Sequence, residues 1–307
     1  MTIDSSIPSK YREIQDLPGV IAHRGYSGKY PENTMLSYEK GVEAKATALE
    51  GDIRLTKDGE IIMMHDMKLN RTTTGHGKIG EVNYHGYIDG LETKSDPPQP
   101  IPLFRDVVKL MLRQDVIDRN MYMIIDIKFD NPIEIMEAVH KLLKTEFGDH
   151  MDTLARQLVI GIWHVDFLPE AQKIGFPICF IGLSLAAARK HFLHTADYLS
   201  IPFAALADAD GHAFLKEARS LNKKVITWTI NEVEQMHECL ALGVDGVVGD
   251  HVELMIKNLW ENIEGMSPEE YEKYIESSTY LGSSRRRMYF YLLKNAMHYA
   301  SRGYIGM

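Results

Sequence analysis

The sequence predicts an α/β fold, a (β/α)8 TIM barrel with a hairpin and loop insertion after strand 2 and a C-terminal helical extension. Eight short apolar runs alternate with segments of helical periodicity, and each strand-then-helix unit returns the chain to the same side of a parallel sheet. Polar residues directly follow several of these runs, as they do at the C-terminal ends of barrel strands. The alternative is a doubly wound open sheet, but no glycine-rich dinucleotide loop follows the first run.

The expected strands and helices account for most of the first 263 residues. The strands are 20–22, 48–53, 122–127, 158–163, 178–184, 198–202, 225–230 and 246–249. The helices are 32–45, 103–112, 132–147, 167–174, 185–193, 211–221, 233–242 and 252–263. Eight such units close naturally into a barrel, and 307 residues is an ordinary length for one.

One segment departs from the alternation. Thr56-Lys57-Asp58-Gly59 is typical of a tight turn, because Asp-Gly favours positive φ. The apolar run 61–64 then returns as a hairpin strand, and the stretch 71–102 is a long insertion rich in Gly, Thr, Asp and Pro. Long loops in compact domains tend to be functional. We therefore expect a barrel domain over 1–265, with an insertion at about 56–102, and an amphipathic, basic extension over 266–307.

Composition excludes several classes of protein. A net charge of −9 argues against nucleic-acid binding, which depends on Lys and Arg. The two cysteines, Cys179 and Cys239, lie in apolar surroundings and predict buried free thiols in a reducing compartment. The N-terminus has no signal-peptide core, and no apolar run reaches the roughly 18 residues that span a bilayer. We expect an intracellular protein, peripheral to a membrane or lipid droplet, or alternatively a soluble cytoplasmic one.

Polar residues lie where buried strands would otherwise stay apolar. They are His23 and Arg24 after the first strand, Glu50 and Asp52 on one face of the second, His65 ending the hairpin, Asp126 and Lys128 on one face of the third, Trp228 and Asn231 closing the seventh, and Asp250 closing the eighth. Any one of them alone would most simply be a capping or core residue. Together, at strand ends that converge on one mouth of a barrel, they predict an active site.

Three of these residues predict a metal site. Glu50, Asp52 and Asp126 offer only carboxylate oxygens, and no histidine or cysteine joins them. Such a set suits one hard divalent cation, Mg²⁺ or Ca²⁺, rather than zinc.

Four more residues suit a phosphodiester. Arg24 offers a planar fork for phosphate oxygens, and Lys128 offers a point charge. His23 and His65 have side chains that titrate near neutrality, as a general acid and base require. The set as a whole predicts metal-dependent phosphodiester cleavage.

These residues resemble the glycerophosphodiester phosphodiesterase family over the whole barrel. The matching motifs are His23-Arg24-Gly25, Pro31-Glu32-Asn33-Thr34, Glu50-Gly51-Asp52, Thr56-Lys57-Asp58-Gly59, His65-Asp66, Arg71-Thr72-Thr73, Ile101-Pro102-Leu103, Trp228-Thr229-Ile230-Asn231 and Gly243-Val244-Asp245-Gly246.

The resemblance implies a role for each matched residue. The implied roles are one Ca²⁺ or Mg²⁺ on Glu50, Asp52 and Asp126, catalysis by His23 and His65, and substrate contacts from Arg24, Lys128 and Trp228. It further implies that a substrate hydroxyl attacks phosphorus to give a cyclic phosphate that water later opens. We assign His23 as the first base and His65 as the acid, and the reverse assignment stays open.

One position departs from the family pattern. The third ligand is usually Glu in a Glu-x-Lys pair, whereas this chain has Asp126. That residue and the C-terminal extension make the chain look most like the fungal phosphatidylglycerol phospholipase C branch. The expected reaction is therefore cleavage of phosphatidylglycerol to diacylglycerol and glycerol phosphate. The alternatives are a soluble glycerophosphodiester phosphodiesterase that gives glycerol 3-phosphate and an alcohol, and an inactive lipid-binding barrel.

The C-terminal segment separates these alternatives. Written as a helix, it has an apolar stripe and a basic group opposite; the stripe is Tyr289, Leu292, Leu293, Ala296, Met297 and Ala300, and the basic group is Arg287, Lys294, His298 and Arg302. The stripe either packs on the barrel or, with Arg285-Arg286-Arg287, contacts an anionic membrane through 285–302. A lipid substrate also requires apolar surface near the mouth, which we expect from Tyr84, Tyr87, Ile88, Leu91 or Phe203.

Overall fold

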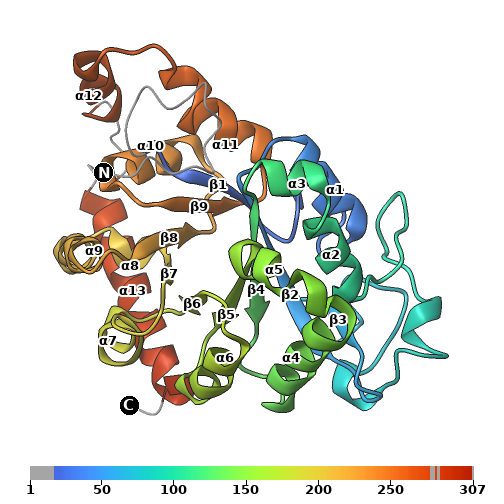
Figure 1. The fold of residues 1–307 in the computed structure, drawn as a ribbon. Coiled ribbons are helices and arrows are strands. Elements are labelled where there is room, and N and C mark those ends of the chain that lie inside the picture. The colour runs from blue at the N-terminus through green and yellow to red at the C-terminus, as the bar shows by residue number, and fades with distance from the viewer. Residues whose placement is uncertain (1–16, 277–280, 282–283, 306–307) are drawn as a thin grey trace.

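The computed structural model describes residues 17–276, 281 and 284–305, in which eight parallel strands close into a barrel (Figure 1). The strands are β1 (Gly19–Ala22), β2 (Ala48–Leu55), β4 (Tyr122–Ile127), β5 (Leu158–Ile162), β6 (Ile178–Ile181), β7 (Tyr198–Pro202), β8 (Lys224–Trp228) and β9 (Gly246–Gly249). Neighbours follow the order β1-β9-β8-β7-β6-β5-β4-β2, and β1 pairs with β2 to complete the closure. The predicted TIM barrel is confirmed.

Helices surround the barrel at the predicted places (Figure 1). They are α1 (Met35–Glu43), α2 (Phe104–Met111), α4 (Glu134–Phe147), α6 (Leu168–Ile174), α7 (Leu185–Ala187) with a π-helical continuation (Ala188–Phe192), α9 (Ala209–Ser220), α10 (Val233–Leu242) and α11 (Val252–Leu259). Short helices that we did not predict are α3 (Gln114–Asp118), α5 (Met151–Gln157) and α8 (Phe203–Leu206). Four to seven residues are too few for helical periodicity to show in a sequence.

The first helix begins three residues later than predicted. Thr34 caps it, because its side chain accepts a hydrogen bond from Ser37 N (3.2 Å) and the Ser37 hydroxyl accepts one from Thr34 N (3.2 Å). The two preceding residues, Glu32 and Asn33, therefore lie in a loop at the mouth of the barrel instead of in a helix.

The barrel interior is filled by alternate residues of the strands, among them Ile21, Ile124, Val159 and Cys179. A larger apolar layer lies between the strands and the helices. Both cysteines are buried and free, as predicted.

The insertion after β2 has a small core of its own. β3 (Ile61–Met63) pairs antiparallel with β2, which confirms the hairpin. Apolar side chains from the hairpin and the following loops then pack together; they are Ile62, Met64, Leu69, Ile79, Ile88 and Ile101. Two 3-10 turns, Ile79–Glu81 and Ile88–Gly90, carry part of this core. The prediction that Ile88 offers apolar surface to a lipid was therefore wrong, because the loop needs it for its own packing.

Two helices follow the barrel, α12 (Pro268–Glu276) and α13 (Ser284–Ile305), and α13 lies against α8 (Figure 1). Phe290 of α13 is buried against Phe203, with ring centroids 5.6 Å apart, so Phe203 is not lipid-facing surface either. Lys294 forms an ion pair with Asp208 (2.7 Å). None of the helices in the described residues combines the length and hydropathy needed to cross a bilayer.

The inward face of α13 is rotated by about one residue from the predicted apolar stripe. Leu293 and Met297 pack on the barrel as expected. Tyr289 and Leu292 are instead each 60% exposed, and Phe290 takes the inward position. The side chains of Arg287 and Arg302 lie outside the described residues. The division of the chain at residue 265 remains a prediction.

Candidate active site

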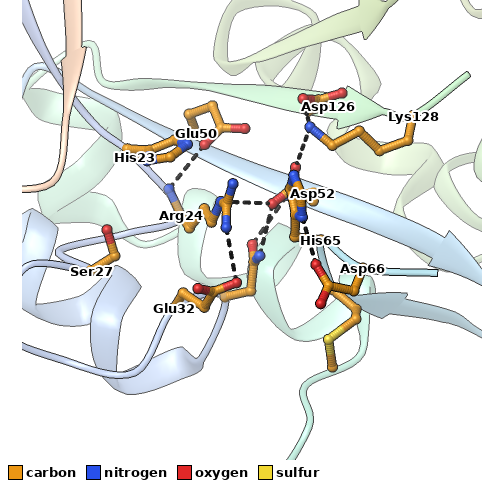
Figure 2. Close-up of polar contacts among 12 residues, drawn as sticks. His23, Arg24, Ser27, Glu32, Glu50, Asp52, His65, Asp66, Asp126 and Lys128 are labelled. Carbon is orange, nitrogen blue, oxygen red and sulfur yellow. Dashed lines mark hydrogen bonds and ion pairs between the residues drawn. The ribbon is translucent and has the colours of Figure 1, made fainter. Parts of the chain in front are cut away.

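Three carboxylates from two adjacent strands meet at the C-terminal end of the barrel. The parallel register of β2 and β4 pairs Asp52 with Asp126, and Glu50 lies two residues earlier on the same face of β2. All three side chains are buried, and one ligand oxygen from each lies within 4.8 Å of the others. The structure therefore brings the predicted metal ligands together (Figure 2).

Burial and mutual repulsion perturb these carboxyl groups. Desolvation and the Asp52 charge raise the pKa of Glu50 to about 7. Desolvation also raises the pKa of Asp126, although Lys128 opposes it. Burial would likewise raise the pKa of Asp52, but Lys128 and Arg24 outweigh it and hold that pKa well below its usual range. Three carboxyl groups therefore share one buried cluster with two cationic side chains, Arg24 and Lys128. The negative and positive charges of this cluster do not fully cancel.

The donor set fits a divalent cation. Its oxygens are the ligands that Ca²⁺ and Mg²⁺ prefer. Oδ1 of Asp52 is buried and accepts no hydrogen bond from the described residues. Lys128 Nζ lies 2.8 Å from this oxygen but outside hydrogen-bonding geometry. A buried carboxylate oxygen that accepts no hydrogen bond of regular geometry, beside two other carboxylates, is one that a divalent cation would satisfy.

Arg24 is held over the carboxylates by an unusual backbone. Its φ of 53° is left-handed, and its N–H donates to Glu50 Oε2 (2.9 Å). The guanidinium reaches Glu32 (Nη1 to Oε1, 3.0 Å) and Asp52 (Nε to Oδ2, 3.4 Å). Gly25 follows with φ 77°, at a place where a Cβ would collide with the first turn of α1. The loop fixes the fork of Arg24 at the edge of the carboxylate cluster.

Lys128 approaches the cluster from the other side, as Figure 2 shows. Its Nζ lies 2.5 Å from Asp126 Oδ2 and 5.1 Å from the ring centroid of Trp163. Trp163 Nε1 also donates to Asp126 Oδ1 (2.7 Å). Lys128 and Trp163 therefore orient both carboxylate oxygens of Asp126, whose side chain is one methylene group shorter than that of Glu.

A carboxylate holds His23 by its Nδ1 atom. Asp250 Oδ1 lies 2.6 Å from Nδ1, and the same carboxylate accepts hydrogen bonds from Asn231 Nδ2 (2.6 Å) and Ser27 Oγ (3.0 Å). Burial by itself would lower the pKa of His23, but Asp250 and Glu50 outweigh it and raise that pKa above 6.5. With Nδ1 engaged, Nε2 is the nitrogen left for a substrate.

A second carboxylate holds His65 in the same way. Asp66 Oδ1 lies 2.8 Å from His65 Nδ1, and Arg71 donates to Asp66 Oδ2 (2.6 Å) and to Glu32 (2.7 Å). The hydrogen bond from Arg71 is the main cause that lowers the pKa of Asp66 to about 2. Arg54 fixes the backbone by donating to the His65 carbonyl (Nε to O, 3.1 Å).

One cavity of about 130 Å³, which we call the mouth, is lined by both histidines, by Arg24 and Lys128, and by the carboxylates of Glu50 and Asp126. Trp228 also lines it, and its ring centroid lies 5.9 Å from that of Trp163. The Nε1 of Trp228 is buried and donates no hydrogen bond within the described part of the chain. A substrate oxygen in the mouth could accept from it.

The structure thus gathers every residue that we predicted for the site, including Asp250, although its pairing with His23 was not predicted. Three further supporting residues were not predicted: Glu32, Asp66 and Trp163. The signals for Glu32 and Asp66 were weak but present, since Glu32 is inside a motif and Asp66 follows His65. Trp163 gave no signal, because an aromatic residue at a strand end is most often core.

Comparisons with known proteins agree with this geometry. Residues 23–254 match the family model described as Glycerophosphoryl diester phosphodiesterase family. The chain is 30% identical over 249 residues to a glycerophosphodiester phosphodiesterase of Bacillus altitudinis, covering 78% of this chain and 96% of the relative. It is 29% identical over 261 residues to a glycerophosphodiester phosphodiesterase of Bacillus subtilis, covering 77% and 85%. The crystal structure of a glycerophosphodiester phosphodiesterase from Thermotoga maritima matches with a TM-score of 0.62 and 25% identity, covering 78% and 97%.

Proposed function

Since the chain belongs to the glycerophosphoryl diester phosphodiesterase family, whose members are phosphoric diester hydrolases, we propose that it hydrolyses a glycerophosphodiester to glycerol 3-phosphate and an alcohol. The observation that carries the proposal is a buried carboxylate triad flanked by two histidines, each held by a carboxylate. A barrel that only bound lipid would have no use for this arrangement, so the inactive alternative is disfavoured.

In this proposal Glu50, Asp52 and Asp126 hold one Ca²⁺ or Mg²⁺, which when bound stabilises the charge that develops on the phosphoryl oxygens. Arg24 and Lys128 lie on either side of Asp52 (Figure 2). In this proposal both contact the same phosphate. Trp228 Nε1 donates to a substrate oxygen, which satisfies its buried N–H.

The two histidines move the protons. His23 Nε2 takes the proton of the attacking glycerol hydroxyl, and the Asp250 carboxylate stabilises the imidazolium that forms. His65 Nε2 gives its proton to the oxygen of the leaving alcohol as the P–O bond breaks. Water then opens the cyclic phosphate with the two roles exchanged, which returns both histidines to their starting states.

Phosphatidylglycerol is a second candidate substrate, and one observation favours it. Helix α13 exposes Met288, Tyr289, Tyr291, Leu292 and Tyr299, each 57% exposed or more. Aromatic and apolar side chains on an amphipathic helix suit a membrane interface. In this second reading the protein is peripheral to an anionic membrane or lipid droplet, as the fungal phospholipase C branch suggests. The relatives in Bacillus altitudinis and Bacillus subtilis are glycerophosphodiester phosphodiesterases, which favours the first reading.

Product analysis tests both candidates together. The purified full chain is given glycerophosphocholine and phosphatidylglycerol vesicles in parallel, with Ca²⁺ or Mg²⁺. We expect glycerol 3-phosphate from the soluble diester, with turnover abolished by a chelator and by His23→Ala or His65→Ala. The control is His194→Ala, an exposed histidine that precedes β7 at the opposite end of the barrel. Diacylglycerol from the vesicles alone would replace the first candidate by the second, and no turnover of either would contradict both.

A further inference from the structure

A second hollow adjoins the mouth. Its volume is about 330 Å³, against about 130 Å³ for the mouth, and it lies within the size range of small-molecule sites. Three residues, His65, Lys128 and Trp163, line both. The two spaces therefore meet beside His65, the histidine that we assign to the leaving oxygen. Figure 2 labels His65 and Lys128.

The hollow has an apolar wall that is exposed to solvent. Met67 and Phe129 line it and are 45% and 37% exposed. Phe129 meets Trp163 edge to face, with ring centroids 6.3 Å apart. Outside α13 the described residues expose five large hydrophobic side chains, so finding two of them on the wall of one hollow marks this wall as a candidate binding surface.

The charged groups around the hollow are already paired with one another. Arg54 forms an ion pair with Asp130 (2.5 Å), and Asp66 accepts from Arg71 (2.6 Å). A ligand in the hollow therefore meets apolar surface and neutralised pairs rather than a net charge.

A cationic ligand is disfavoured for a second reason. The aromatic ring that would attract it, Trp163, already has Lys128 Nζ 5.1 Å from its centroid. A second cation near that ring would be repelled by the lysine. The chemistry that remains favourable is an uncharged, apolar group.

We propose that this space, the Met67–Phe129 hollow, is the subsite for the leaving alcohol and that it selects an apolar alcohol. This inference rests on the proposed function. With the phosphate held between Arg24 and Lys128, the leaving oxygen faces His65, and the alcohol continues past His65 into the hollow. The apolar surface that we sought in the insertion and at Phe203 is thus supplied by different residues.

A series of glycerol 3-phosphate diesters tests the subsite. The leaving alcohols are ethanol, butanol and octanol, assayed with metal at concentrations where the diesters are monomeric. We expect kcat/KM to be roughly tenfold higher for the octyl than for the ethyl ester, because each methylene group that enters the hollow leaves water. Phe129→Ala and Met67→Ala should reduce this octyl-to-ethyl ratio by about threefold or more.

Two matched variants separate packing from binding. Phe129→Leu keeps an apolar surface and should keep most of the octyl preference. Leu221→Ala removes an exposed apolar side chain that follows α9, at the other end of the barrel, and should leave the ratio unchanged. If Phe129→Ala lowers kcat/KM equally for the ethyl and octyl esters, Phe129 has only a structural role. That result would overturn the subsite.

The remaining outcomes are also decisive. Equal kcat/KM along the alcohol series would overturn the subsite while leaving the proposed function intact. Faster cleavage of glycerophosphocholine than of the octyl ester would show a cation site and overturn the apolar selection. Failure to cleave the ethyl ester and glycerophosphocholine at all would instead contradict the proposed function itself.

Discussion

Replacing Asp250 by Asn tests the proposed role of His23 most directly. The change keeps the shape of the side chain and removes its charge. In the native protein the carboxylate accepts from Asn231 and Ser27 and lies 2.6 Å from His23 Nδ1. An amide still offers one oxygen to the imidazole, but its NH2 group then faces the donor of Asn231. The variant should therefore fold, with a weaker and less well-oriented partner for the histidine.

The size of the effect follows from the hydrogen bond. A hydrogen bond to a charged group contributes about 1.5–3 kcal/mol. The negative charge matters most when His23 has taken the proton and become an imidazolium, so most of the loss falls on the transition state. A loss of about 2–3 kcal/mol lowers kcat roughly 30- to 160-fold, at 1.36 kcal/mol per factor of ten.

The direction of the change in pH dependence provides a second, independent test. Burial by itself lowers the pKa of His23, whereas Asp250 and Glu50 raise it. Removing the Asp250 charge should therefore lower this pKa. A base with a lower pKa loses its proton at lower pH, so the acidic limb of the kcat/KM profile should move to lower pH.

The assay is a pH–rate profile with glycerophosphocholine and saturating metal. The control is Asp245→Asn, which changes a carboxylate at the start of β9 that binds Lys224 and the Val225 N–H at the opposite end of the barrel. Two results would contradict this role of Asp250: a kcat within threefold of the native value, or an acidic limb that moves to higher pH. Equal losses in both aspartate variants would show general damage to the barrel.

Three further predictions follow from the carboxylate cluster. Trp163→Phe removes the indole donor to Asp126 and should weaken Ca²⁺ or Mg²⁺ binding by about 10- to 100-fold in calorimetry; unchanged binding would show that the hydrogen bond does not orient the ligand. Because the pKa of Glu50 is about 7 in the metal-free protein, the cation must displace a proton, so affinity should be higher at pH 8 than at pH 6, with proton release that changes with buffer ionisation enthalpy. Gly51→Ala should lower the free energy of unfolding in urea by about 1–3 kcal/mol, since an added Cβ would overlap buried side chains. The control is Gly90→Ala, which should change this free energy far less, because no atom lies within 4 Å of the added Cβ.

Local patterns in the sequence were enough to predict the barrel and the main residues of the site. Strand positions follow from runs of buried residues, and parallel pairing follows from the intervening helices. With β2 and β4 as parallel neighbours, the register pairs Asp52 with Asp126 and places Glu50 two residues earlier on the same face. The motifs around His23 and His65 then identify the histidines without any knowledge of distances.

Features that depend on contacts between distant segments could not be predicted in this way. His23 and Asp250 are separated by 227 residues in the chain, and only closure of the barrel between β1 and β9 makes them partners. The inward face of α13 depends on the surface of α8 that it meets, which is why a pattern of apolar residues alone placed Tyr289 on the wrong side.

The fold, the family resemblance and the identity of the catalytic groups could be predicted from residue types, because they depend on fixed local spacings. Three features depend instead on tertiary contacts: which carboxylate holds each histidine, how Trp163 orients Asp126, and where apolar surface adjoins the mouth. The physical reason is that hydrogen bonds, burial and pKa shifts are set by through-space distances of a few ångströms, and chain order alone does not specify those distances.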